Sequence, residues 1–280
     1  MIAASATPAT RAVSPARRLK RAAKFLIRAT SNGWSTFDRI TADLHSLGVR
    51  RGGTLMVHSS LSSLGFVVGG AETVIRASLA AIGPEGTLVM PSHSWERSGN
   101  GDFTFDLRTT PSCVGTISEV FRTMPGVSRS LHPTHSVAAT GAQAEFLTQG
   151  HELASTPCGD GTPYSKLIEA QCQILFLGTT LDQNTIFHSL EAFAQARYLM
   201  RTEEEAFTIT DADGQTRIMR FRRHERGPDR RFAATQDVLE ARGILRKGRV
   251  AASASLLVES APMAELILDL LREDPRYLLE

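Results

Sequence analysis

The sequence predicts an α/β fold with a mostly parallel central sheet, flanked by helices, and a smaller antiparallel hairpin element. Residues 54–58, 87–91 and 174–177 are short apolar runs with the length of buried strands. Loops of small residues and helical patterns lie between these runs, and strands that alternate with helices form parallel sheets. Residues 206–210 and 217–221 flank a strong turn sequence, which indicates the hairpin.

Composition sets the class of protein. The 280 residues are 42% hydrophobic, which is ample for a buried core and excludes a disordered chain. The formal net charge of +2 does not indicate a nucleic-acid partner. No apolar run approaches the roughly 20 residues that span a bilayer, so we expect a cytoplasmic protein with no membrane partner. Cys113, Cys158 and Cys172 lack the paired spacing of a zinc or redox motif, so the sequence predicts core thiols and no metal site.

The N-terminal segment differs from the rest of the chain, because it is basic and has no acidic residue before Asp38. Organellar transit peptides share this composition, and residues 22–29 fit a basic helix on a membrane surface. We favour a basic, flexible arm over residues 1–37. Residues 38–280 are then predicted to form a single domain.

Helical patterns account for most of the segments between the strands. We predict helices at residues 38–47, 74–81, 117–121, 142–149, 185–197, 235–241 and 262–272, and one around Leu167 and Ile168. Thr36 or Asp38 is expected to cap the first of them, and Gly48 to end it. Residues 97–111 read as a long surface loop. His151, just after a predicted helix, is interpreted as an exposed or capping histidine.

A loop of small residues follows the first predicted strand. It contains Ser59, Ser60, Ser62 and Ser63, and Gly69–Gly70 then precedes a helix. Free backbone N–H groups and a helix dipole favour a bound anion at such a place, although a plain turn explains the same residues. The P-loop and dinucleotide motifs are both absent.

Two histidines three residues apart, His132 and His135, flank Pro133. The proline prevents a regular helix here, and no third metal ligand of standard spacing accompanies the pair. We therefore interpret this segment as the polar wall of a cleft.

The stretch from Gly178 to Glu191 has the strongest chemical pattern. It follows a predicted strand, and either Asp182 or Asn184 can cap a helix. Thr185, His188 and Glu191 then share one stripe of that helix, at positions i, i+3 and i+6. An imidazole next to a carboxylate is what a general base needs, while a surface helix with a His/Glu pair is the simpler interpretation.

Four blocks of sequence together give a family resemblance. They are residues 56–61 with Gly69–Gly70–Ala71, residues 86–91, Arg129–Ser130 with residues 132–136, and residues 182–191. Over about residues 38 to 275 the chain resembles the aminoglycoside 3-N-acetyltransferase family, which has its own antibiotic N-acetyltransferase fold, distinct from that of the GNAT acetyltransferases. The resemblance implies an acyltransferase of antibiotic resistance that uses acetyl-CoA.

The resemblance also implies roles for individual residues. The residues expected along the coenzyme are His58, Ser59, Ser60, Leu61, Ser62, Ser63, Gly69, Gly70, Arg129, Ser130, His135 and Ser136. The residues expected at the reacting centre are His188, Glu191, Thr185 and Asp182.

We expect His188 to take a proton from the attacking amine while Glu191 stabilises the imidazolium. Thr185 is the expected donor to the oxyanion of the tetrahedral intermediate. This mechanism transfers the acetyl group directly. A ping-pong route through Cys113 or Cys158 is the alternative.

The sequence defines the acceptor amine less well than it defines the chemistry of acetyl transfer. Aminoglycosides are polycations, and acidic residues are available at Asp102, Asp106, Asp160 and Glu203–Glu205, but residues 222–231 are strongly basic. The alternatives are a non-aminoglycoside amine, a metal-dependent hydrolase built on His132, His135 and His188, and a non-catalytic protein that binds coenzyme A. The sequence leaves open whether the chain forms a homodimer.

Overall fold

The computed structural model describes residues 33–225 and 229–280. Residues 1–32 of the predicted basic arm and residues 226–228 of the basic loop lie outside the described residues. Strand β1 (Trp34–Ser35) pairs in parallel with β3 (Phe66–Val67), so the last part of the predicted arm is joined to the fold. Within the described part of the chain, every helix is too short or too polar to cross a membrane.

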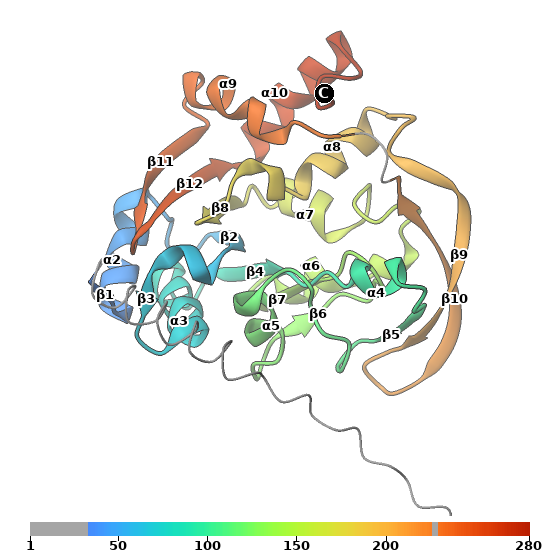
Figure 1. Cartoon of the computed structure of the whole chain (residues 1–280), viewed down its shortest axis with the longest axis horizontal. Helices are drawn as coiled ribbons and strands as arrows, with labels where there is room; N and C mark the ends of the chain where they lie inside the picture. Colours follow the sequence, from blue (N-terminus) through green and yellow to red (C-terminus); the bar gives the residue numbers. More distant parts are fainter. Residues whose placement is uncertain (1–32, 226–228) are drawn as a thin grey trace, which may run out of the picture.

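The central sheet has seven strands in the order β11-β12-β8-β2-β4-β7-β6 (Figure 1). Their bounds are β2 Thr54–Ser59, β4 Thr87–Pro91, β6 Ser128–Arg129, β7 Val137–Gly141, β8 Gln173–Leu177, β11 Leu245–Val250 and β12 Ser253–Glu259. The three apolar runs of the sequence are β2, β4 and β8, which pair in parallel at the centre. Antiparallel pairs extend the sheet on both sides. The predicted α/β class is confirmed.

Helices cover both faces of this sheet. They are α2 Phe37–Leu47, α3 Gly70–Ile82, α4 Trp95–Gly99, α5 Thr116–Arg122, α6 Ala144–Thr148, α7 Pro163–Glu169, α8 Ile186–Phe193, α9 Gln236–Ala241 and α10 Ser260–Glu273. Alternate residues of the strands point to opposite faces. Leu175 packs in the apolar cluster that contains α2, α3 and α5, whereas Ile174 and Phe176 pack in the cluster that contains α6, α7, α8 and α10.

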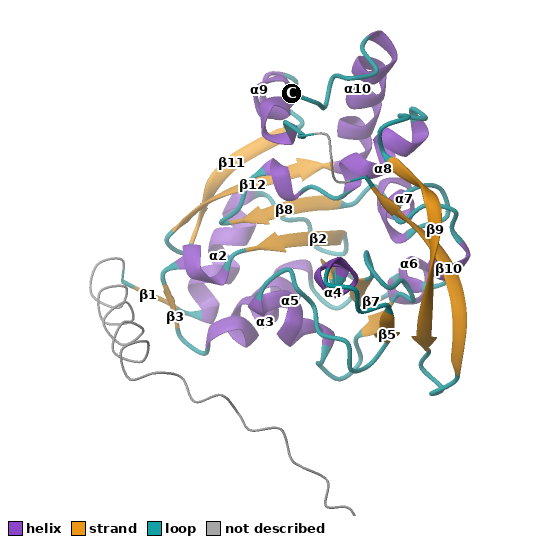
Figure 2. Ribbon diagram, turned by 45° about the vertical axis from the view of Figure 1, so that its right-hand side comes forward, coloured by secondary structure: helices purple, strands orange, loops and turns teal. Residues whose placement is uncertain are grey.

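The predicted hairpin is confirmed and is longer than expected. Strands β9 (Met200–Thr210) and β10 (Thr216–His224) pair along most of their length, and they stand at one side of the molecule (Figures 1 and 2). The prediction of a plain loop over residues 97–111 is wrong, because β5 (Thr104–Asp106) adds to β9 in parallel. Phe105 and Phe207 are buried where β5 meets the hairpin, which explains the extra strand.

Two further expectations are corrected. Helix α8 ends at Phe193 and does not reach residue 197, because the backbone turns at Gln195, where φ is 54°. His151 is fully buried in a short 3-10 helix (η2, His151–Leu153) and is not exposed. Its ring bridges Ser130 Oγ and the carbonyl oxygen of Pro157, at 2.9 Å each.

Gly141 at the end of β7 gives a test of the packing between β7 and β4. Its φ is +116°, and an added Cβ would lie 2.1 Å from Gly86 O. We expect Gly141→Ala to lower the free energy of unfolding by more than about 3 kcal/mol in urea denaturation, because backbone strain and a backbone clash add. Gly214, with φ +79° and nothing within 4 Å of an added Cβ, is the matched control. Gly214→Ala should cost only about 1–2 kcal/mol, and equal losses in the two variants would contradict this description.

Candidate active site

A cavity of about 920 Å³ opens at the carboxyl ends of the three parallel strands. His58 and Ser59 end β2, Pro91 ends β4, and Gly178 follows β8, and all four line the cavity. The carboxyl edge of parallel strands is where α/β folds place their binding sites. The far wall comes from the hairpin and the segment after it, through Arg201, Arg223, His224, Glu225, Arg230 and Phe232.

Helix α8 presents the predicted stripe to this cavity. Thr185 occupies the N-cap position and His188 lies one turn further on, and both line the cavity. Asn184 assists the start of the helix, since its Oδ1 accepts a hydrogen bond from Ile186 N at 3.3 Å. Glu191 follows on the same side of the helix, where it is fully buried.

His188, Glu191 and Arg230 form a connected group. The His188 Nδ1–H donates to Glu191 Oε2 at 2.6 Å, and Arg230 Nε donates to Glu191 Oε1 at 3.1 Å. Burial of a carboxylate costs several kcal/mol unless cations and donors compensate it, and these two partners supply both. Because Nδ1 carries the proton towards Glu191, the lone pair of His188 is on Nε2. The arrangement suits a base at the cavity wall.

Further side chains enclose this group. The rings of His224 and Phe232 lie 4.6 Å and 5.3 Å from the His188 ring, centroid to centroid. Burial, followed by the negative charge of Glu191, raises the pKa of Tyr198. The carboxylate therefore lies in a poorly solvated environment, where its interaction with His188 is stronger than it would be in water.

Neutral imidazoles make up much of the remaining wall. Burial lowers the pKa of His58 to about 3, and burial together with neighbouring histidines lowers the pKa of His93 to about 3. His93 Nε2 lies 2.6 Å from Tyr164 Oη, and that hydroxyl donates to His135 O at 2.9 Å. These rings supply hydrogen-bonding groups to the cavity without adding positive charge at pH 7.

The residues predicted along the coenzyme divide into two groups. His58, Ser59, Ser60 and His135 line the cavity. Leu61, Ser62 and Ser63 lie next to it in a 3-10 helix (η1, Leu61–Leu64), and Gly69–Gly70 begins α3, but none of these five lines the cavity. Ser59 Oγ and His58 Nε2 are buried without a hydrogen-bond partner among the described residues.

Arg129, Ser130 and Ser136 are placed differently from the prediction, because none of them lines the cavity. The Arg129 guanidinium donates to Ser136 Oγ at 3.0 Å, to Thr110 O at 2.6 Å and to Ser92 O at 2.7 Å. Burial lowers its pKa to about 9. Ser130 and Ser136 are fully buried. The donors that were expected to meet a coenzyme instead hold the segment around β6 and β7 in place.

Asp182 lines the cavity and also has a structural role. Its Oδ1 accepts a hydrogen bond from Ala233 N at 2.8 Å, and its Oδ2 accepts one from Thr180 Oγ1 at 3.0 Å. Asp182 therefore ties the loop after β8 to the 3-10 helix η4 (Phe232–Thr235), which follows Arg230.

The three cysteines of the described chain are free thiols. Burial raises the pKa of Cys113, and it raises the pKa of Cys158 well above its usual value. A thiol held in its protonated form is a weak nucleophile, so the ping-pong alternative lacks support here. The set His132, His135 and His188 is not among the groups of described side chains whose ligand atoms lie close enough together to hold a metal.

Sequence reasoning missed Arg230, His224 and Tyr198 as parts of the site. Arg230 and His224 belong to the stretch 222–231, which the sequence marks only as strongly basic. The sequence feature that could have indicated a cationic partner was Glu191 itself. A Glu on the inner face of an apolar helix requires a cationic partner, and the basic stretch is a source of one.

Known proteins resemble this chain in sequence and in fold. A family model described as "Aminoglycoside 3-N-acetyltransferase" matches residues 56–272. The chain is 31% identical over 260 residues to aminoglycoside N(3)-acetyltransferase IX of Micromonospora chalcea, covering 83% of this chain and 92% of the relative. A solved structure of an AAC(3)-IVa variant in complex with a gentamicin superposes with a TM-score of 0.78 and 31% identity, over 90% of this chain and 93% of the other. The structure of AAC-IIIb in a binary complex with CoASH has a TM-score of 0.76 and 28% identity. The match covers 86% of this chain and 97% of the other.

The buried histidines predict an acid-sensitive fold. His58 and His151 each have a native pKa of about 3, lowered by burial from 6.5. Below pH 6.5 the unfolded chain binds protons that the native chain does not, so stability is complete above pH 6.5 and falls as the pH decreases towards 3. Each of these two histidines should remove about 1.4 kcal/mol between about pH 7.5 and about pH 5.5, as measured by urea unfolding.

One variant assigns this effect. His151→Gln should reduce the dependence of stability on pH, because it removes one of the two buried imidazoles. Equal stability of the unmodified chain at both pH values would contradict the assignment.

Proposed function

The chain belongs to the aminoglycoside 3-N-acetyltransferase family, and we propose that it transfers the acetyl group of acetyl-CoA directly to the 3-amino group of an aminoglycoside. The observation that carries the proposal is the His188–Glu191–Arg230 group at the wall of a large cavity. Residues 38–280 act in this proposal as one acetyltransferase domain.

His188 is the general base. The amine nitrogen attacks the thioester carbonyl carbon, a C–N bond forms, and the C–S bond to coenzyme A breaks. His188 Nε2 accepts the proton that the amine loses and can return it to the departing thiolate. Glu191 keeps Nδ1 protonated and stabilises the imidazolium that forms.

Glu191 in turn depends on Arg230. The guanidinium contacts both carboxylate oxygens, at 3.1 Å and 3.3 Å, so the fully buried carboxylate has a fixed orientation and a cationic partner. Arg230 thus acts through Glu191 as a positioning residue.

The oxyanion of the tetrahedral intermediate needs a donor near His188. Thr185 is suitably placed, because its side chain lines the cavity one helical turn before His188, at the N-terminus of α8. A hydroxyl and a helix N-terminus both favour developing negative charge.

The coenzyme is expected along the ends of β2 and β8. Ser59 Oγ and His58 Nε2 are buried polar atoms without a partner among the described residues, and both residues line the cavity. Buried polar atoms normally have hydrogen bonds, so these two are available to the amide groups of a pantetheine chain. The complex of the related AAC-IIIb with CoASH supports this class of co-substrate.

A second acceptor class is favoured by one specific observation. Three arginines line the cavity, Arg201, Arg223 and Arg230, and two of them share the single carboxylate of Glu205. An amine that also carries a carboxylate or phosphate would gain a charged partner there, whereas a polycation would rely on Asp182 and Glu225.

The role of His188 is tested by His188→Ala, with thiol release from acetyl-CoA as the measurement. We expect kcat to fall by about 10²–10⁴-fold, while the affinity for acetyl-CoA changes by less than about threefold, because the base acts in the chemical step. His45→Ala, at an exposed position on α2, is the control and should retain full activity. Near-normal turnover by folded His188→Ala protein would exclude the mechanism.

The acceptor is tested by a panel of amines at saturating acetyl-CoA. The proposal expects thiol release with aminoglycosides such as gentamicin and apramycin, and mass spectrometry should locate one acetyl group on the 3-amino nitrogen. Turnover confined to amines that carry an anionic group would instead support the second acceptor class. A panel without any turnover would contradict catalysis of acetyl transfer to either class.

A further inference from the structure

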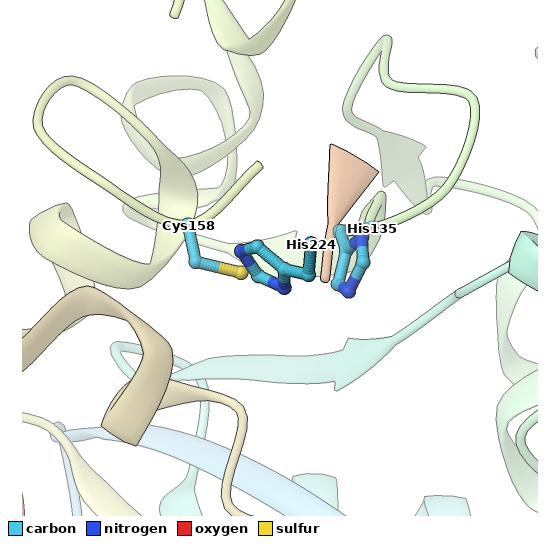
Figure 3. A group of neighbouring side chains, drawn as sticks. All are labelled: His135, Cys158 and His224. Atoms are coloured by element: carbon cyan, nitrogen blue, oxygen red, sulfur yellow. The ribbon is translucent and has the colours of Figure 1, made fainter. Parts of the chain in front are cut away.

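One group of side chains carries out no chemical step of the proposed acetyl transfer. His135, Cys158 and His224 each offer a potential ligand atom, and these three atoms lie within 4.8 Å of one another. Figure 3 shows the three side chains gathered, with the Cys158 sulfur directed towards His224. They come from three separate segments: the turn before β7, the loop before α7, and the last residue of β10.

We propose that His135, Cys158 and His224 form a binding site for a zinc ion. Zn²⁺ is commonly bound in proteins by thiolate and imidazole ligands, and this group offers one thiol and two imidazoles. In a tetrahedral site the ligand atoms are separated by about 3.5 Å, since Zn–N and Zn–S bonds are about 2.0–2.3 Å long. A shift of roughly 1 Å in side-chain position is therefore enough to close the group around a metal.

Each of the two histidines has a ring nitrogen that can bind a metal. His224 Nε2 is buried and has no hydrogen-bond partner among the described residues. His135 Nδ1 is 2.8 Å from Thr134 Oγ1, which fixes the ring and leaves Nε2 for another partner. A hydrogen bond from the second ring nitrogen is the usual support of a metal-binding histidine.

The position of the group indicates an open coordination site. His135 and His224 both line the cavity, whereas Cys158 is fully buried behind them. Three protein ligands leave the fourth zinc position to water or to a group of a bound molecule, and here that position faces the cavity. On binding, the Cys158 thiol loses its proton to solvent and becomes the thiolate ligand.

The site would tie the hairpin to the central domain. His224 ends β10, and its ring is 4.6 Å from the ring of His188. A metal that joins His224 to Cys158 and His135 therefore fixes one neighbour of the proposed base. This proposal does not depend on the acceptor or on the chemistry of acetyl transfer.

The test measures metal directly and so separates this proposal from the proposed function. The full chain, without an affinity tag that binds metal, is stripped with a chelator and dialysed against zinc, and bound zinc is measured by mass spectrometry. We expect about one equivalent per chain, and titration of the stripped protein with Co²⁺ should give a thiolate-to-cobalt absorption band.

Variants then assign the ligands. Loss of an outer-shell partner alone weakens metal binding by about 10–100-fold, so Cys158→Ser and His224→Ala should each raise the Kd for zinc by more than about 100-fold. Cys113→Ser, which removes a thiol outside the group, should bind zinc as the unmodified chain does.

Two results would overturn the proposal. One is substoichiometric zinc in the folded, unmodified chain together with a cobalt spectrum that lacks the thiolate band. The other is full zinc binding by Cys158→Ser. The unmodified chain supplies the first result whether or not the variants fold.

Discussion

The active-site side of the molecule depends on one buried carboxylate. Glu191 has no exposed surface, and it is compensated by His188 on its own helix and by Arg230 from a segment 39 residues further along the chain. Without either partner the carboxylate would remain buried and incompletely paired, at a cost of roughly 3–5 kcal/mol. The same contact that orients the proposed base therefore also fixes the segment after the hairpin against α8, so that folding and the proposed catalysis share one interaction.

The sheet brings the other parts of the site to the same place. Strands β2, β4 and β8 are parallel, so residues far apart in the sequence, such as His58, His93 and Thr185, reach a common edge. Their apolar interiors make these strands rigid, while the polar residues that follow each strand end face the cavity. Rigid placement of this kind lowers the entropic cost of bringing a thioester and an amine together.

Local patterns in the sequence were enough for the three central strands, the hairpin and most of the helices, but not for β5 or for all of the partners in the site. The strands and the Thr185–His188–Glu191 stripe follow from periodicities of two and about 3.6 residues, which depend only on neighbours in the chain. Arg230, His224 and Tyr198 reach the site through tertiary structure, and no short spacing marks them. Arg129 shows the reverse case: the family resemblance implied a contact with the coenzyme, but in the fold backbone carbonyl oxygens of Ser92 and Thr110 accept its hydrogen bonds. The sequence shows that Arg129 can donate hydrogen bonds, but it does not show which acceptors will lie next to the guanidinium in the fold.

The most direct measurement of the central claim is kcat/KM for Glu191→Gln, compared with that of the unmodified chain. The substitution keeps the size of the side chain, but it removes the charge that stabilises the imidazolium and replaces one acceptor oxygen with an NH2 donor. The account predicts a decrease in kcat/KM of about 100-fold or more, because the protonated base has lost its anionic partner. A folded variant with the kcat/KM of the unmodified chain would contradict the account.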